Sequence, residues 1–148
     1  MEALDRYLKM QAAQDMRLKA SAVFVVVALE TPGQIAGYFT LSAMALAQTG
    51  VPAAARRHIP RYPLVSATLI GRLAVAKERQ GQGLGSMLLA SALRKAYDSA
   101  DVVGSSMVVV DAIDERAVRF YEAHGFVRLP DSMRLIIPMR ALRSMLTQ

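Results

Sequence analysis

The chain has 148 residues and a net charge of +6, with 18 Lys and Arg against 12 Asp and Glu. It contains no Cys and two His, which excludes disulfides, a thiol nucleophile, thiolate metal sites and a His-based zinc site. A chain of this length can bury one core of its own. We therefore expect a single, metal-free domain over residues 1–148.

The basic charge is a first clue to the ligand. Fourteen of the 18 cationic residues are Arg, whose flat guanidinium donates two parallel hydrogen bonds to a phosphate. A phosphate-rich cofactor or a nucleic acid would use such residues, although a basic surface also serves solubility alone. The longest uncharged apolar run, residues 20–29, is too short to span a membrane. Charges throughout residues 2–19 exclude a secretory signal, so we expect a cytoplasmic protein.

The first half of the chain predicts one helix and three strands. Residues 3–20 place Leu4, Leu8, Ala12 and Met16 on one helical face. Two apolar stretches predict a hairpin, and a loop and a third strand follow it. The hairpin comprises residues 21–29 and 35–43 around a turn at 31–34, the loop spans 50–63, and the third strand spans 68–75.

The second half predicts alternating helices and strands. They are a helix at 86–97, a strand at 105–112, a helix from Asp114, and a closing hairpin of 126–129 and 133–139. Asp114 is a preferred N-cap, Ile113 and Val118 can form a hydrophobic staple, and Gly125 suits the left-handed residue after a helix. The order of elements indicates an α+β fold with a mixed, mostly antiparallel sheet flanked by helices.

A glycine-rich run, Arg79-Gln80-Gly81-Gln82-Gly83-Leu84-Gly85, joins the third strand to the next helix. Glycines at alternate positions let backbone N–H groups point inward at the positive end of that helix, which favours a phosphate or pyrophosphate. The spacing fits neither the G-x-G-x-x-G of dinucleotide folds nor the G-x-x-x-x-G-K-[ST] of nucleotide-triphosphate loops. A plain structural turn remains the alternative.

Two motifs resemble those of the GNAT superfamily of acetyl-CoA-dependent N-acetyltransferases. Gln80-Gly81-Gln82-Gly83-Leu84-Gly85 matches the signature Q/R-x-x-G-x-G/A, and residues 71–75 before it resemble the fourth strand of that family. About 35 residues later, residues 116–126 resemble the family's A-x-x-F-Y-x-x-x-G-F helix and strand. The resemblance implies a GNAT fold, here without the strand and helix with which GNAT chains usually open.

A narrower resemblance is to the GNAT toxins of bacterial toxin–antitoxin pairs. It is carried by Gly71-Arg72-Leu73-Ala74-Val75, the Arg- and Pro-rich loop before it, residues 4–12 and residues 37–42. Such toxins acetylate the α-amino group of aminoacyl-tRNA and block translation, and their partners are ribbon–helix–helix antitoxins that bind operator DNA. Family members are often homodimers. One departure is Asp111, where many relatives have His.

The resemblance implies how acetyl-CoA is held. The main chain of residues 73–75 would pair with the pantetheine arm, and the N–H at the Val75 end would polarise the acetyl carbonyl. The residues that would bind the coenzyme are Leu73, Ala74, Val75, Arg79, Gln80, Gly81, Gln82, Gly83, Leu84, Gly85 and Ser86. Lys77 and Arg79 would meet the adenosine phosphates or remain solvated.

The departing thiolate needs a proton, and a Tyr can supply it because phenol and thiol have comparable proton affinities. Tyr121 matches the family position for this general acid; a plain core aromatic is the alternative. No strong base stands out, and an aminoacyl ester's amine needs none near pH 7. Candidate tRNA contacts are Arg56, Arg57, Arg61 and Arg72, with Arg72 equally explained as a structural strand residue.

Two other functions stay open from the sequence. The chain could acetylate a small-molecule amine or a protein N-terminus, although its basic loop suits a cationic substrate poorly. It could also be a non-catalytic module that binds a partner protein or DNA, against which the glycine run and Tyr121 weigh. A small ribbon–helix–helix protein encoded by the neighbouring gene would favour the toxin hypothesis.

Overall fold

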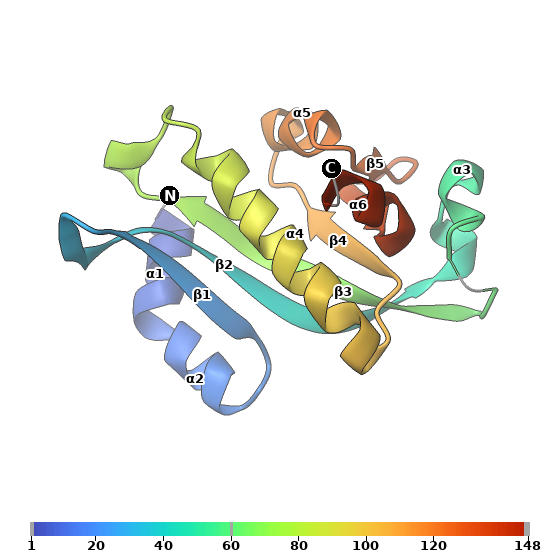
Figure 1. Ribbon diagram of the computed structural model, residues 1–148, viewed down its shortest axis with the longest axis horizontal. Coiled ribbons are helices and arrows are strands. Elements are labelled where there is room, and N and C mark those ends of the chain that lie inside the picture. Colours follow the sequence, from blue (N-terminus) through green and yellow to red (C-terminus); the bar gives the residue numbers. More distant parts are fainter. Residues whose placement is uncertain (1, 60, 147–148) are drawn as a thin grey trace. The chain divides into compact units, whose positions relative to one another are not determined.

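The protein forms a mixed α+β fold in the computed structural model, which describes residues 2–59 and 61–146 (Figure 1). Six strands form one sheet in the order β1-β2-β3-β4-β6-β5. The α+β prediction is thus confirmed. The chain divides into two compact units, residues 1–42 with 70–92 and residues 43–69 with 93–148. Pro60, which falls in the predicted loop at 50–63, lies outside the described residues.

The elements in chain order are these. They are α1 Glu2–Met10, α2 Ala12–Arg17, β1 Ala22–Ala28, β2 Thr31–Ala47, α3 Ala53–Arg56, β3 Leu64–Val75, α4 Leu84–Val103, β4 Met107–Asp111, α5 Glu115–Ala123, β5 Val127–Arg128, β6 Arg134–Pro138 and α6 Met139–Leu146. Short 3₁₀ turns occupy Gln48–Gly50 and Lys77–Arg79.

The N-terminal helix is broken, contrary to the single helix predicted over 3–20. The chain turns at Gln11 between α1 and α2, and this turn lets both Tyr7 and Ala12 face the sheet, where they are buried with Tyr38. Met16, predicted on the apolar face, is instead exposed. Leu4 belongs to the same predicted face, but its side chain is outside the described part.

The predicted hairpin exists, but its turn is earlier than expected. β1 pairs antiparallel with β2, from Ala22 opposite Leu41 to Ala28 opposite Thr31, with register shifts near Val27. The predicted turn at 31–34 is therefore wrong, because β2 already begins at Thr31. Pro32 and Gly33 are tolerated there because they stand at the start of a strand, where a missing ladder donor costs little.

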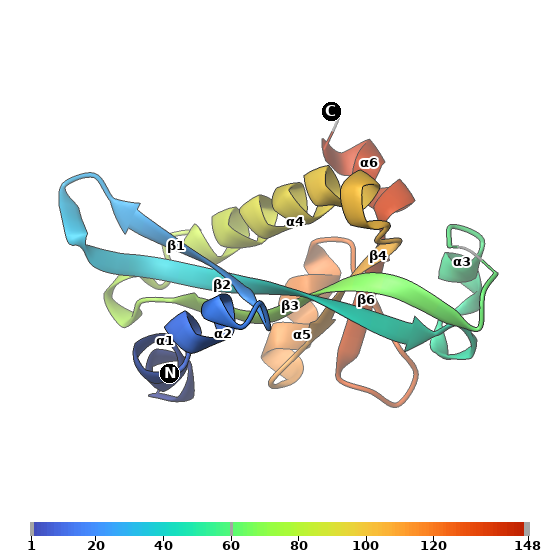
Figure 2. The same ribbon diagram turned by 90° about the horizontal axis from the view of Figure 1, so that it is seen from below.

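In the first unit, helices cover both faces of the strands. Gly37 on β2 lies against Leu88 of α4, whereas Tyr38, the next residue, packs with Tyr7 of α1. Consecutive strand residues point to opposite faces. Figure 2 accordingly shows α4 on one side of β1 and β2, and α1 and α2 on the other.

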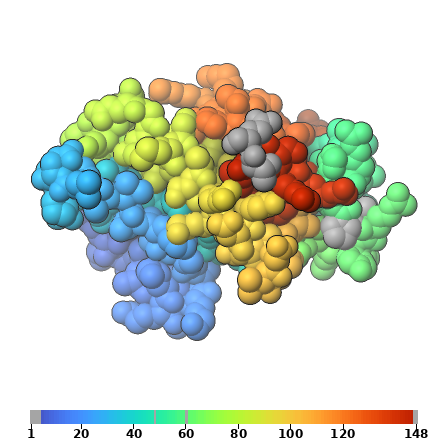
Figure 3. Space-filling view, in the orientation of Figure 1, coloured from blue at the N-terminus to red at the C-terminus, as the bar shows by residue number. Residues whose placement is uncertain are grey.

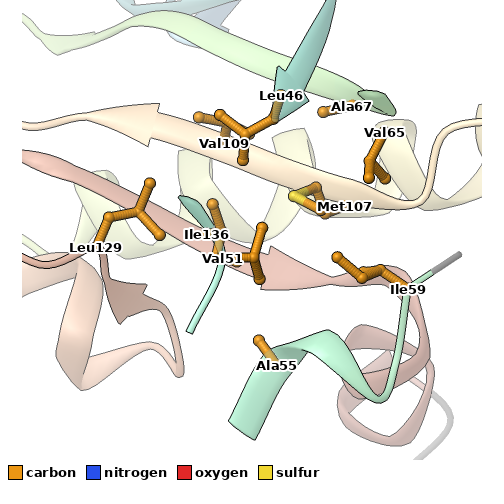
Figure 4. Packing of buried hydrophobic residues seen from close by; sticks show 10 residues of the cluster. All are labelled: Leu46, Val51, Ala55, Ile59, Val65, Ala67, Met107, Val109, Leu129 and Ile136. Atoms are coloured by element: carbon orange, nitrogen blue, oxygen red, sulfur yellow. The ribbon is translucent and has the colours of Figure 1, made fainter. Parts of the chain in front are cut away.

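The second unit has its own apolar core. β4 pairs antiparallel with β6, and β6 with β5, so the predicted closing hairpin is confirmed. One face of β4 and β6 meets the segment around α3 in a cluster of buried residues (Figure 4). The cluster comprises Leu46, Val51, Ala55, Ile59, Val65, Ala67, Met107, Val109, Leu129 and Ile136. Helices α3 and α6 were not predicted from the sequence.

The predicted ends of α5 are confirmed. Asp114 caps the helix, because its Oδ1 accepts from the Ala117 N–H at 2.8 Å. Gly125 takes the left-handed conformation after the helix, with φ +94°. Val118 is buried, but Ile113 is 63% exposed, so the expected staple contributes little. These caps fix where α5 begins and ends, and hence the position of Tyr121 within the second unit.

Candidate active site

The glycine-rich run has the conformation that an anion-binding turn requires. Gly81 and Gly83 have φ of +80° and +78°, a region that residues with a Cβ rarely adopt. Apart from the glycine itself and its two chain neighbours, no described heavy atom lies within 4 Å of the position a Cβ would take at either residue. The run is therefore open on the side of both missing side chains, and it belongs to the visible surface in yellow-green (Figure 3).

Helix α4 begins within this run, at Leu84, and presents its N-terminus there. The Met87 N–H donates to the Gly83 carbonyl at 3.2 Å and closes the first turn. The N–H groups that precede it have no acceptor within the helix, and the first turn carries no acidic residue. Open glycines followed by the positive end of a 20-residue helix fit a pyrophosphate well.

The strand that leads into the run is tightly packed against its neighbour. A Cβ at Gly37 would lie 2.9 Å from the Ala74 carbonyl oxygen and 2.7 Å from Leu88 Cδ1, so only Gly fits. After the strand, the Ala76 N–H donates to the Ala36 carbonyl at 2.8 Å. The Gln80 side chain reaches back to the Val75 carbonyl at 3.3 Å. These contacts hold the backbone of residues 73–75 beside the run.

Arg79 already has partners on the β1–β2 hairpin. One guanidinium nitrogen donates to Thr31 Oγ1 at 3.3 Å, and another lies 3.9 Å from a Glu30 carboxylate oxygen. Glu30 is well exposed, so this ion pair is weak. Lys77 is exposed. Both cations lie in the turn before the glycines, and their role toward phosphates stays a prediction.

Tyr121 is a buried residue of α5 in the second unit. Its side chain is 9% exposed, and its ring packs edge-on against Phe120 and Phe126 with centroids 5.3 and 5.5 Å away. Burial raises the pKa of the phenol to about 12. The phenol is therefore protonated throughout the physiological range.

The candidate tRNA-contacting residues fall in two places. Arg56, Arg57 and Arg61 are exposed residues of the α3 segment in the second unit. Arg56 also donates from Nε to the Val51 carbonyl at 2.8 Å, and Arg57 donates to His58. Arg72 belongs to the first unit, with the glycine run and residues 73–75, and its guanidinium stacks on Tyr7.

Asp111, the noted departure from the toxins, has a structural partner. It stands opposite Arg134 across β4 and β6, and its carboxylate accepts from Nε and Nη2 of that residue at 2.7 and 2.9 Å. These hydrogen bonds raise the pKa of Arg134. His124 also has a partner, because its Nδ1 lies 2.8 Å from the Phe120 carbonyl oxygen. The sequence did not reveal the Asp111–Arg134 pair.

Comparison with known proteins decides the family. The protein-family model described as an acetyltransferase (GNAT) domain matches residues 20–128. The chain belongs to the GNAT acetyltransferase family. It is 31% identical to the tRNA-acetylating toxin of Mycobacterium tuberculosis, over 97% of this chain and 84% of that protein.

Solved structures of GNAT toxins share its fold. A mutant of KacT superposes with a TM-score of 0.90 at 29% identity, covering 98% of this chain and 86% of that one. AtaT complexed with acetyl-methionyl-tRNAfMet superposes with a TM-score of 0.89 at 26% identity, covering 99% and 87%. The GNAT fold and the acetyltransferase class predicted from the sequence are both confirmed.

No described helix is long and apolar enough to cross a membrane. Within residues 2–59 and 61–146, no group of three His, Asp or Glu could hold a metal ion. The family's donor is acetyl-CoA, and the open glycine run before α4 fits its pyrophosphate.

Gly83→Ala tests the glycine run as part of the coenzyme site. A Cβ at φ +78° costs about 1–2 kcal/mol, and the loop relieves it by turning its N–H groups away from the pyrophosphate. We expect the Kd for acetyl-CoA, measured by calorimetry, to rise about tenfold. Gly33→Ala is the matched control, because Gly33 has open space and no positive φ. Equal Kd values for the two variants would remove Gly83 from the site.

Proposed function

We propose that this protein acetylates the α-amino group of aminoacyl-tRNA and blocks translation as the toxin of a toxin–antitoxin pair. The observation that carries the proposal is the 31% identity over 97% of the chain to a tRNA-acetylating toxin. The α3 segment supports it, because three exposed Arg residues on a net basic chain suit the phosphates of RNA.

The coenzyme is held mainly by backbone in this proposal. Acetyl-CoA supplies an acetyl group activated as a thioester. The main chain of residues 73–75 pairs with the pantetheine arm, and the residues from Arg79 to Ser86 surround the pyrophosphate. The N–H at the Val75 end of β3 donates to the acetyl carbonyl oxygen and stabilises the charge that develops there. The tight packing at Gly37 supports this role, because it keeps the strand in place.

Tyr121 acts as the general acid of the transfer and is then protonated again. The amine nitrogen forms its bond to the acetyl carbon as the carbon–sulfur bond breaks, and the phenol gives its proton to the departing sulfur. With a pKa of about 12, the phenol is a weaker acid than the thiol that forms, whose reference pKa is about 8.5. The surplus proton on the new amide nitrogen therefore returns to the phenolate, which restores Tyr121 without a separate base.

The remaining proposals concern the extent of the domain, the cellular location and the partners. We place the catalytic unit in a single domain over residues 1–148, which acts in the cytoplasm and forms a homodimer. Solved relatives include AtaTR bound with acetyl-CoA and a KacTA–DNA complex. By analogy we propose a ribbon–helix–helix antitoxin as the protein partner, with Arg56, Arg57 and Arg61 binding tRNA.

The proposal is tested by following a labelled acetyl group. The protein is incubated with labelled acetyl-CoA and with charged tRNA, uncharged tRNA or a panel of small amines. We expect label on charged tRNA alone, and its release as the N-acetyl amino acid when the ester is hydrolysed. Label on small amines and none on tRNA would assign a metabolite acetyltransferase; no transfer to any acceptor would assign a binding module.

A further inference from the structure

Arg72 is joined to α1 by a stacking contact. The guanidinium carbon lies 3.5 Å from the centroid of the Tyr7 ring, close enough for a strong cation–π interaction. Tyr7 is 6% exposed, and Arg72 is half-buried on β3. One flat face of the guanidinium is thus covered by the Tyr7 ring.

The Tyr7 ring is itself fixed from two further sides. Its hydroxyl donates to Asp15 Oδ2 of α2 at 2.7 Å, and Gln11 donates to Oδ1 of the same carboxylate at 3.1 Å. The Tyr7 hydrogen bond lowers the pKa of Asp15, so the acceptor stays ionised at neutral pH. On the sheet side, Tyr7 stacks on Tyr38 with centroids 6.4 Å apart and planes 9° apart. Arg72 therefore meets a ring that cannot swing away.

The backbone of Arg72 is held as closely as its side chain. Its N–H donates to Oγ1 of Thr40 at 3.0 Å, and Thr40 is 1% exposed on β2. A Cβ at Gly71 would lie only 2.9 Å from the same oxygen, so a side chain there would crowd Thr40 and disturb this hydrogen bond. Main chain and side chain are both anchored directly before residues 73–75.

The anchored face is the one on which α1 and α2 rest. Ala74 packs against the cluster of Tyr7, Ala12 and Tyr38, and it shares the face of Arg72 because side chains two apart on a strand point the same way. One series of contacts, Asp15 to Tyr7 to Arg72 to Thr40, thus ties two helices and two strands together.

We propose that Arg72 is a positioning residue for acetyl transfer and not a contact for tRNA phosphate. Stacked on Tyr7, it holds α1 and α2 against β3 and fixes the path of residues 73–75, which bind the coenzyme. The inference rests on the proposed function for the coenzyme role of residues 73–75. Withdrawing the guanidinium from Tyr7 to reach a phosphate would break the series of contacts.

The test compares Arg72→Met, Tyr7→Leu, their double variant and Tyr7→Phe. Arg72→Met keeps the length of the side chain and removes the guanidinium, whereas Tyr7→Leu removes the ring and leaves Arg72 intact. Tyr7→Phe keeps the ring and removes only the hydrogen bond to Asp15, so it separates the stacking contact from the rest of the series. Calorimetry gives the Kd for acetyl-CoA, and the salt dependence of uncharged tRNA binding counts phosphate contacts. Thermal unfolding checks that each variant is folded.

We expect Arg72→Met and Tyr7→Leu each to raise the Kd for acetyl-CoA about tenfold, as for a loss of preorganisation worth about 1.4 kcal/mol. The Kd of the double variant should be no higher than that of the single variant that binds acetyl-CoA more weakly, because both substitutions remove the same contact between Arg72 and Tyr7. Tyr7→Phe keeps the ring under Arg72 and loses only the hydrogen bond to Asp15, so it should raise the Kd less than Tyr7→Leu does. The salt slope of tRNA binding should be the same in all four.

Two results would overturn the inference. One is an unchanged Kd for acetyl-CoA in Arg72→Met. The other is a salt slope that falls by about 0.7 to 0.9 in Arg72→Met but not in Tyr7→Leu, which is the loss of one phosphate contact. If the wild-type protein binds no tRNA, the proposed acceptor is wrong, and the coenzyme measurement still decides the role of Arg72.

Discussion

Tyr121→Phe should lower the turnover number by about 100-fold or more while the Kd for acetyl-CoA changes little. In the proposed mechanism the phenol gives up its proton in the transition state, and loss of a general acid costs about 10²–10⁴-fold in rate. The ring remains, so its packing against Phe120 and Phe126 is preserved. Single-turnover kinetics with charged tRNA separate this chemical effect from binding.

A matched control removes a hydroxyl elsewhere in the same unit. Tyr62 is 68% exposed, and Tyr62→Phe should leave the turnover number within about twofold of the wild-type value. Full activity in Tyr121→Phe would assign Tyr121 to the core alone. A loss accompanied by much weaker acetyl-CoA binding would point to a packing defect instead.

The pKa of Tyr121 also shapes the expected pH dependence. Burial raises it to about 12, so the acid form persists as the pH rises and is lost only in strong alkali. The acceptor amine must be neutral, and its pKa lies below the α-amino reference of about 7.7–8.0. The rate should therefore rise from pH 6 to pH 8 and then stay level to pH 10. A fall between pH 8 and 10 that is absent from Tyr121→Phe would contradict the buried phenol.

Local chemistry explains what the sequence predicted well. The left-handed conformation at Gly81 and Gly83 and the cap at Asp114 depend on a few consecutive residues, so spacing and residue type are enough to predict them. The GNAT signature is likewise a short pattern whose geometry follows from its glycines. The coenzyme loop was recognisable for this reason, although the role of each residue in it stays a prediction.

Long-range packing explains what the sequence missed. The break at Gln11 places Tyr7 and Ala12 together on the sheet, and no local pattern within 3–20 requires it. The sequence left two roles open for Arg72, a tRNA contact and a structural strand residue. Its partner Tyr7 could not be recognised, because it is 65 positions earlier in the printed sequence. The glycines inside β2 and β3 were a usable signal, since Gly within a strand often marks a close backbone approach.

Charge reversal in the α3 segment should abolish acetylation of tRNA and toxicity, but not coenzyme binding. Arg56→Glu with Arg57→Glu replaces two cations on exposed positions. If each contacts one phosphate, the slope of log affinity against log salt falls by about 1.4 to 1.8. The kcat/KM for charged tRNA should then drop at least about 100-fold at low salt, while the Kd for acetyl-CoA stays within about twofold.

The hydrogen bond of Arg56 to the Val51 carbonyl complicates that variant, because Val51 belongs to the buried cluster under the segment. Arg57→Glu with Arg61→Glu keeps this bond, so equal losses in both pairs would assign the effect to charge. Lys9→Glu with Arg17→Glu makes the same change in net charge on exposed positions of the first unit and should cost far less. Unchanged acetylation of tRNA in both α3 pairs would move the nucleic-acid site away from this segment.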